Sequence, residues 1–504
     1  MQQDNLSAKH NPEWAMFLPA ISSFYISGLG QQRCGKQYFD PTRLPAGIQD
    51  TEMLNFLNSQ KGLYTYKWGL YSAGHADLDT TRPNDQEDLI RNREAGTFLL
   101  GDSGGFQISM GVWPANWSDP NCPRAMAKRK AVLNWMDTYM DYGMVLDIPT
   151  TTLGRPHVQP LVGIHSYQDA VNATRINNDY FINNRTGRCK FLNVLQGTTH
   201  AEADDWYAQM KDYCDPHKYP DRHFNGWAAG GRNKLDVQLI LKRLVNIIHD
   251  GLLEQGLHDW IHYLGISWME YAILYTDIQR AIRKYHNPDL TISFDCASPF
   301  YAAAKGQAYH TNRIQHGRKW SYRMDATAEN KAYAGDTRPF AQAVIQEGIH
   351  KTFTSSPVTD RMTLGDLCYR GVGAVGKHGK ETKTSWDTLS YVLLQGHNVW
   401  MHINAVQEAN RQYEQGVIPE MLMHEKFDRV LVRDVIDHVF AQRDRARSLA
   451  VIDEYSWLWK QFYKATNSTA HFNQLFEIVE TPDADTADSE ELDADAAMAD
   501  NLGE

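Results

Sequence analysis

The chain has 504 residues, of which 42% are hydrophobic, and it carries a formal net charge of −11. That is enough for a barrel of about 250–300 residues plus further segments. Its six cysteines show no repeating spacing and we find no signal or membrane segment, which argues against a secreted or membrane protein and predicts a reducing cytoplasm.

The negative charge is concentrated at the C-terminus. Residues 480–504 contain ten acidic residues and no basic one, so the rest of the chain has a net charge of about −1. This segment is rich in Asp and Ala and has no aromatic residue, so we expect it to be disordered. Because the rest of the chain is nearly neutral, any basic surface must be a local patch of Lys and Arg side chains.

The first 90 residues show little regular pattern, and only the apolar run at 17–20 predicts a strand. The first distinctive segment is DSGGFQ at 102–107, which follows the apolar run 97–100 after a single glycine. Its glycines allow close approach of a ligand, its ring can stack on one, and its carboxylate can take or give a proton. These groups at the end of a buried strand indicate a pocket for a flat, polar, ring-shaped ligand.

The same segment also resembles the nucleophile segment of chymotrypsin-like serine proteases, with His75 as the base. That chemistry needs histidine and aspartate around the serine. In that family these two residues lie far upstream of the serine, in separate halves of a double β-barrel. His75 and Ser103 are only 28 positions apart, so we reject this interpretation.

Five more apolar runs are each followed by polar residues or glycines, at intervals of 30 to 49 residues. Such intervals suit strand–helix units, and several contain a helical pattern, as at 237–248 and 271–282. Functional groups at successive strand ends are typical of a (β/α)8 barrel. We therefore predict an α/β fold, a (β/α)8 TIM barrel with insertions and a C-terminal helical subdomain. The six runs lead to Asp102, Asp147, Gln196-Gly197, Gly230-Gly231, Gly265 and Asp295.

The predicted domain organisation has three parts. The barrel, with an N-terminal extension, is expected in residues 1–350. A helical subdomain packed on the barrel follows in 351–479, with helices over 385–413 and 427–462. The disordered acidic tail occupies 480–504.

From about residue 90 to 300, these segments together resemble the tRNA-guanine transglycosylase family. Such enzymes cut the N-glycosidic bond of a guanine in a polynucleotide and insert a 7-deazaguanine in its place. Each segment alone is a weak signal, but five in the right order at barrel spacing are a strong one. The matching segments are DSGGFQ at 102–107, VLQG at 194–197, GWAAGG at 226–231, HYLG at 262–265 and FDC at 294–296.

The resemblance implies two catalytic residues. Asp295 would attack the anomeric carbon of the sugar and hold a covalent glycosyl-enzyme intermediate. Asp102 would act as general acid toward the leaving guanine and then as general base toward the incoming base.

The resemblance also implies roles in base recognition. Phe106 would stack on the purine, and Asp147 would accept hydrogen bonds from its amidine edge. Gln196 and the Gly230 amide would address the carbonyl oxygen, and Asp236 falls where the family has a glutamate that senses the 7-substituent. Taken singly, Asp147 and Asp236 are better explained as caps of the following helices. The expected substrate-binding residues are Ser103, Phe106, Asp147, Gln196, Gly197, Gly230, Gly231 and Asp236.

One departure from the family concerns metal. Its tRNA-acting members carry a zinc site of three closely spaced cysteines and a later histidine. Here Cys368 stands alone with Asp366 nearby, although His397 matches the histidine segment. Structural zinc needs four ligands, so we expect no metal site, no cofactor, and a packing role for His397.

A second departure follows the nucleophile, where ASPFY at 297–301 replaces a basic turn. Phe300 and Tyr301 are candidates to wedge or stack where a base has left its duplex. The stretch 305–323 interleaves basic and aromatic residues, which suits a strand with unstacked bases. An exposed loop with incidental charge explains it nearly as well. The candidate nucleic-acid contacts are Arg313, Arg318, Lys319 and Arg323.

Both departures point away from a tRNA substrate and resemble the phage and bacterial DNA transglycosylases of the same superfamily. We therefore predict a base-exchange glycosyltransferase whose substrates are DNA and a free 7-deazaguanine base, with tRNA as the alternative polymer. It would act in the cytoplasm, that of the host if it is phage-encoded. A catalytically silent nucleic-acid-binding subunit stays open, although the presence of both Asp102 and Asp295 argues against it. The sequence leaves a homodimer or partner proteins open.

Overall fold

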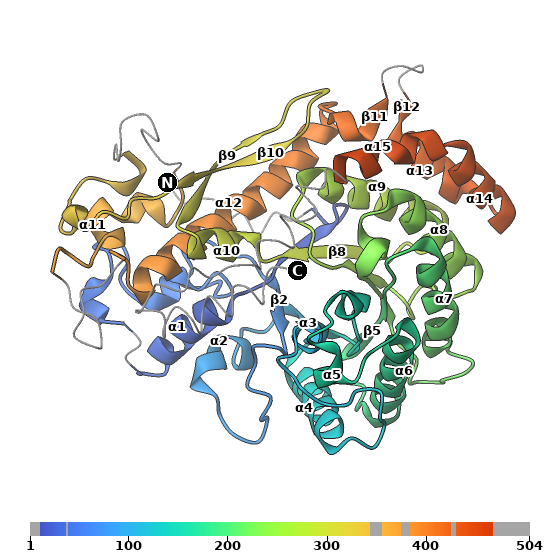
Figure 1. The fold of residues 1–504 in the computed structure, drawn as a ribbon. Coiled ribbons are helices and arrows are strands. Elements are labelled where there is room, and N and C mark those ends of the chain that lie inside the picture. The colour runs from blue at the N-terminus through green and yellow to red at the C-terminus, as the bar shows by residue number, and fades with distance from the viewer. Residues whose placement is uncertain (1–10, 37–38, 343–354, 374–383, 425–429, 467–504) are drawn as a thin grey trace.

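The computed structural model describes residues 11–36, 39–342, 355–373, 384–424 and 430–466 (Figure 1). Its centre is an eight-stranded sheet in which all neighbouring strands are parallel, in the order β1-β8-β7-β6-β5-β4-β3-β2. Ala20 and Leu70 bridge the two edge strands, and the Ile21 N–H donates to the Leu70 carbonyl at 2.9 Å. The strands are β1 Met16–Pro19, β2 Trp68–Ser72, β3 Phe98–Asp102, β4 Tyr142–Met144, β5 Lys190–Leu195, β6 Gly226–Ala229, β7 Trp260–Tyr263 and β8 Thr291–Cys296.

Helices flank this barrel-like sheet, as the (β/α)8 prediction requires. All six strands predicted from the apolar runs are present, and so is the strand predicted at residue 17. The apolar faces predicted at 237–248 and 271–282 lie on α8 and α9. The helices between the strands are α1 Ser23–Arg33, α2 Asp88–Arg91, α3 Gly105–Ser109, α4 Pro123–Tyr139, α5 Gln159–Val162, α6 Tyr167–Asn184, α7 His200–Met210, α8 Val237–His249 and α9 Met269–Tyr285.

The expectation of an irregular first 90 residues is wrong, because α1 and β2 lie there. Glycine lowers helix propensity, and α1 contains Gly28 and Gly30, which hides the helix in the sequence. The glycines serve packing instead. A Cβ on Gly30 would come within 2.6 Å of the Asp85 carbonyl oxygen, so this helix lies directly on the backbone before α2.

The chain after β8 adds α10 Ser298–Ala304 and an antiparallel hairpin of β9 Gln307–Arg313 and β10 Ser321–Ala326. The short α11 Leu364–Leu367 and the long α12 Thr388–Glu414 follow. In Figure 1, α12 extends from the neighbourhood of α1 to that of α9, and it contacts both helices as well as α10 and β1. It therefore covers the barrel where the eighth helix of such a fold belongs.

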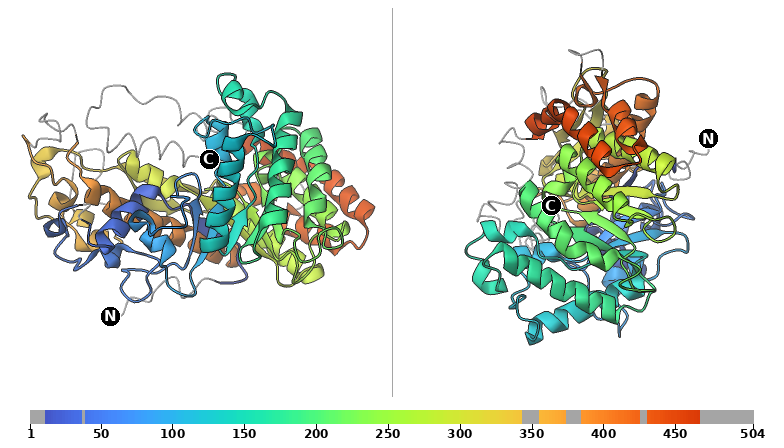
Figure 2. Two further views of the ribbon diagram at one scale, coloured as in Figure 1. Left: turned by 90° about the horizontal axis from the view of Figure 1, so that it is seen from below. Right: turned by 90° about the vertical axis from the view of Figure 1, so that its right-hand side faces the viewer.

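Where helix was expected across 427–462, the described residues form three shorter helices, α13 Val432–Ala441, α14 Arg445–Glu454 and α15 Ser456–Thr466. They follow the short strands β11 Met423–His424 and β12 Val430–Leu431. These helices pack on α8 and α9, as the right-hand view of Figure 2 shows in red over green. The domain boundary near residue 350 stays a prediction, and the acidic tail lies outside the described residues.

The barrel interior is apolar over most of its length. Toward the N-terminal ends of the strands it is filled by rings, with the centroid of Trp260 lying 4.5 Å from that of Phe98 and 4.9 Å from that of Tyr142. Above these rings lies a layer of aliphatic side chains. This layer includes Leu18, Leu70, Leu100, Met144, Leu192 and Val194.

Among the described helices, none is both long and apolar enough to cross a membrane.

Candidate active site

Asp295 lies near the C-terminal end of β8, with only 4% of its surface exposed. Its Oδ1 accepts a hydrogen bond from the Gly265 N–H at 2.8 Å and lies 3.1 Å from Nε2 of His262. Oδ2 accepts no hydrogen bond from the described residues. One carboxylate oxygen is therefore held in place by β7 and the loop after it, while the other is available to react.

His262 is part of a buried chain of hydrogen bonds that crosses the barrel interior. The Trp260 Nε1–H donates to Oγ of Ser293 at 2.7 Å, and that oxygen lies 2.9 Å from Nδ1 of His262. Ser293 then has its own proton to donate to Nδ1, and a His262 ring with its proton on Nε2 can donate that proton to Asp295. The aromatic residues at the bottom of the barrel are thus linked to the candidate nucleophile.

Asp102 ends β3, and its surroundings differ from those of Asp295. Its Oδ2 accepts hydrogen bonds from the Ser72 hydroxyl and, at 3.4 Å, from the Gly104 N–H. Burial raises the pKa of Asp102 above its usual range, the Ser72 hydrogen bond lowers it, and the nearby charge of Asp295 raises it further. A carboxyl group with a raised pKa, near a second carboxylate, is suited to carry a proton to a leaving group.

Asp147 and Gln196 contact each other next to the loop that follows Asp102. The Gln196 Nε2–H donates to Oδ2 of Asp147 at 2.8 Å, and both side chains are buried. A Cβ on Gly105 would lie 2.7 Å from the Asp147 carbonyl oxygen, so the loop after β3 touches the loop after β4. Two of the predicted base-recognition residues therefore lie together, next to the DSGGFQ loop.

The glycines after β6 contribute close packing. A Cβ on Gly230 would lie 2.6 Å from Nε2 of Gln196, and one on Gly231 would lie 2.7 Å from the Gly197 carbonyl oxygen. The predicted role of the Gly230 amide is wrong, because its N–H already donates to the Leu195 carbonyl at 2.8 Å. These glycines bring the strand ends of β5 and β6 together around Gln196.

Asp236 is set apart from this group. Its side chain caps α8 by accepting from the Leu239 N–H, and its Oδ2 lies 2.7 Å from Nε2 of His200 and 2.9 Å from Nε of Arg232. This is the helix-capping role that the sequence left open. Contact with a base substituent stays a prediction for this residue.

Phe106 and Ser103 belong to the loop after β3. Ser103 is buried, and Phe106 is half-buried with the guanidinium carbon of Arg155 5.9 Å from its ring centroid. Arg155 also donates to Oγ of Ser109 at 3.3 Å. Sequence reasoning missed Arg155 because it lies in an irregular segment after β4, far from any recognised motif. Ser72 and His262 were likewise given no role.

The four basic residues are carried on the hairpin, where all of them are exposed. Nζ of Lys319 lies 5.1 Å from the ring centroid of Trp268, and Arg323 pairs with Asp325. The Trp320 N–H donates to Oε1 of Glu270 at 2.8 Å. The turn of the hairpin thus lies at the start of α9, near the loop that holds Asp295, with Arg313 and Arg318 on the same hairpin.

Phe300 does not fit the expectation of a wedge between bases. It is 1% exposed on α10, and its ring centroid lies 5.7 Å from that of Tyr25 in the core. Tyr301 is partly exposed, and Nζ of Lys305 lies 5.2 Å from its ring centroid.

The residues considered for zinc have other partners. Cys368 donates to the Ala328 carbonyl at 3.2 Å, and Asp366 completes the capping box of α11. Nδ1 and Nε2 of His397 lie 2.9 Å from Oγ of Ser356 and 2.8 Å from the Tyr309 carbonyl oxygen. No group of three or more potential ligands is arranged to hold a metal ion in the described ranges.

A scan against protein-family models finds no match to this chain, and a search of the curated proteins finds none either.

Proposed function

We propose that the protein is a base-exchange glycosyltransferase that replaces guanine in DNA with a 7-deazaguanine derivative. The observation that carries the proposal is the pair of buried carboxylates at the C-terminal end of a parallel barrel, in different surroundings. Asp295 is oriented through one oxygen and free at the other, whereas burial and its neighbour raise the pKa of Asp102. Carboxylates in such unequal environments suit one nucleophile and one proton carrier.

In the proposed reaction, Oδ2 of Asp295 forms a bond to the anomeric carbon while the bond from that carbon to the base nitrogen breaks. Asp102 gives its proton to the departing guanine. The incoming base then loses a proton to the Asp102 carboxylate, and its nitrogen displaces Asp295 from the sugar. In this proposal Asp147 and Gln196, which contact each other, would hydrogen-bond the purine-like edge, and Phe106 would stack on the base.

The choice of DNA rests on the basic hairpin and on the sequence after the nucleophile. Arg313, Arg318, Lys319 and Arg323 supply exposed positive charge near the loop that holds Asp295, which suits a sugar–phosphate backbone. We regard the hairpin as an insertion into the barrel, and α13–α15 as a C-terminal helical subdomain. The target base must leave its duplex or lie in an unpaired strand to reach the carboxylates.

The test is an exchange assay with a labelled base, run on matched DNA and tRNA substrates. We expect label in DNA, and a denaturation-resistant adduct between enzyme and oligonucleotide. Asp295→Ala should abolish both, and Asp102→Asn should abolish exchange while leaving the fold intact, because proton transfer is lost.

Three results would contradict the proposal. Wild-type turnover by Asp295→Ala would remove the assigned nucleophile. Label in tRNA but not in DNA would identify tRNA as the substrate polymer and leave the proposed base-exchange chemistry unchanged. Tight binding of nucleic acid with no exchange on either polymer would favour a silent binding subunit.

A further inference from the structure

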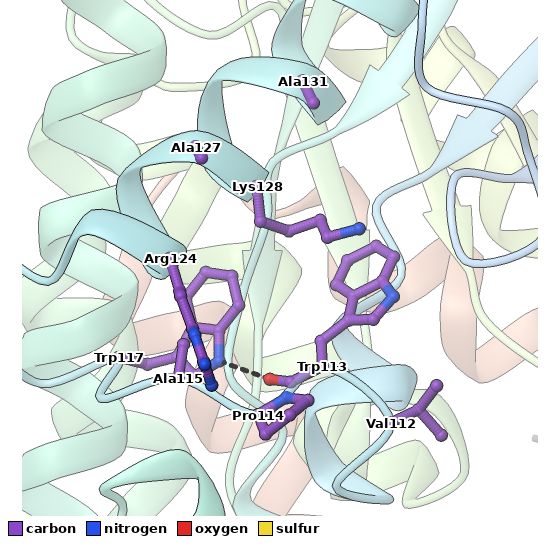
Figure 3. A pocket seen from close by; sticks show the side chains of 9 residues that line it. All are labelled: Val112, Trp113, Pro114, Ala115, Trp117, Arg124, Ala127, Lys128 and Ala131. Atoms are coloured by element: carbon purple, nitrogen blue, oxygen red, sulfur yellow. Dashed lines mark hydrogen bonds between the residues drawn. The ribbon is translucent and has the colours of Figure 1, made fainter.

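A pocket of about 480 Å³ lies between the loop that follows α3 and one face of α4. Trp113 forms an apolar wall together with Val112 and Pro114, and Nζ of Lys128 lies 4.4 Å from the indole centroid of Trp113. Figure 3 shows the ammonium group of Lys128 next to the indole ring of Trp113, and Arg124 further along α4, beside Trp117. The pocket therefore combines a flat apolar surface with two cations.

Neither of these two cations has an acidic partner in the part of the chain that the structure describes. Lys128 and Arg124 lie one turn apart on α4, and neither makes an ion pair with any described residue. The first turn of α4 contains no acidic residue, so the positive end of the helix dipole adds to their charge. Partial burial lowers the pKa of Lys128. A bound anion would relieve this electrostatic cost.

The pocket adjoins the candidate active site through Trp113. Gly104 has a positive φ of 79°, and a Cβ at this position would lie 2.6 Å from the edge of the Trp113 ring. The N–H of the same glycine reaches Oδ2 of Asp102. Only the width of one loop thus separates the apolar wall from the predicted proton carrier. A side chain at position 104 would therefore disturb both Trp113 and Asp102.

We propose that this pocket holds the nucleotide next to the target guanine, with its base on the apolar wall of Trp113 and its phosphate bound by Lys128 and Arg124. The inference rests on the proposed function, which identifies the target guanine. It adds a second binding site for the same strand. Bases stack on aromatic rings whatever their sequence, and cations bind the backbone. The pocket would therefore place the strand without reading its sequence.

The experiment measures binding of a fluorescently labelled oligothymidylate of about eight nucleotides, which contains no guanine. Wild type is compared with Lys128→Ala, Arg124→Ala and the double variant across a salt series. Lys130→Ala is the matched control, because Lys130 is exposed on the same helix but does not line the pocket. We expect the double variant to raise Kd about tenfold or more, and each single variant to reduce the salt slope by roughly one.

Unchanged Kd and salt slope in the pocket variants, or an equal loss in Lys130→Ala, would overturn the inference. A parallel base-exchange assay separates this result from the proposed function. Binding that depends on Lys128 and Arg124 without any exchange would leave the nucleotide site standing and remove the transglycosylase. Base exchange, together with oligonucleotide binding that does not depend on Lys128 or Arg124, would support the transglycosylase and remove the nucleotide site.

Discussion

His262 is fully buried and connects the candidate nucleophile to the bottom of the barrel. Its Nε2 lies 3.1 Å from Asp295 and its Nδ1 lies 2.9 Å from Ser293. With its proton on Nε2, the ring can donate to Oδ1 of Asp295 and leave Oδ2 available for the sugar in the proposed reaction. His262 is a positioning residue in this account.

We expect His262→Leu to slow adduct formation with the oligonucleotide by about 10- to 100-fold, the effect of losing one hydrogen bond to a charged group. His262→Gln should recover part of the rate, since its amide N–H reaches about as far as Nε2–H. The measurement is the single-turnover rate of adduct formation, with the melting temperature of each variant as control. Equal rates in the Leu and Gln variants would mean that the ring only fills space.

Sequence reasoning found the carboxylates but not the groups that hold them. Asp102 and Asp295 stand out because each follows an apolar run. Ser72 and His262 reach them only because β2 pairs with β3 and β7 with β8 in one particular register, which places Ser72 opposite Asp102. Register between strands is a property of the assembled sheet. Ser72 follows an apolar run too, at 68–71, and that was the available signal.

At the scale of elements, α12 meets α9 through a buried polar contact. The Tyr413 hydroxyl donates to Oδ2 of Asp277 at 2.7 Å, and burial raises the pKa of Asp277 to about 7. In the unfolded chain this carboxyl titrates near 4. The folded protein therefore holds an extra proton between these values, and its stability falls as the pH rises from about 4 to about 7.

Asp277→Asn should remove this pH dependence, because the amide stays neutral and still accepts from Tyr413. Relative to wild type, the variant should gain about 1–3 kcal/mol of unfolding free energy between pH 5 and pH 8. Urea unfolding at a series of pH values measures this. Glu454→Gln, at an exposed carboxylate at the end of α14, is the control and should follow wild type. Parallel curves for Asp277→Asn and wild type would refute the shifted pKa.

A second prediction at this scale concerns α10, where Phe300 packs against Tyr25 in the core. We expect Phe300→Ala to lower the unfolding free energy by about 3–5 kcal/mol, as for other buried aromatic residues. Its effect on any activity should be the same for duplex and single-stranded substrates. Tyr301→Ala, one position further and partly exposed, should be nearly neutral for stability. A loss confined to duplex substrates would restore the wedge hypothesis.

The elements that the sequence predicted are those with a clean pattern. β3 to β8 are apolar runs with a polar end, and α8 and α9 have regular apolar faces. The N-terminal elements lack such signals, since α1 carries two glycines and β2 has a glycine and a tyrosine within five residues. The place of α12 in the barrel wall is set by tertiary packing, which no local pattern reports.

For the molecule as a whole, charge is divided between a nearly neutral body and the acidic segment 480–504. We expect deletion of this segment to leave the unfolding free energy within about 0.5 kcal/mol of wild type. Non-specific binding of nucleic acid should tighten, with a changed salt dependence, because the segment competes with phosphates for basic surface. A variant with Asn and Gln in place of its ten acidic residues should behave like the deletion. Equal affinity of all three proteins across a salt series would assign the segment no such role.

The rings of Phe98, Tyr142 and Trp260 fill the lower end of the barrel, so a ligand cannot reach the carboxylates from that end. In the proposed exchange, the departing guanine and the arriving base must therefore both pass through the other end. The two bases compete for one binding site, and the second can bind only after the first has left. The covalent bond between the sugar and Asp295 must therefore persist while the site is empty. During that time water can hydrolyse this bond, so the surrounding loops have to exclude water.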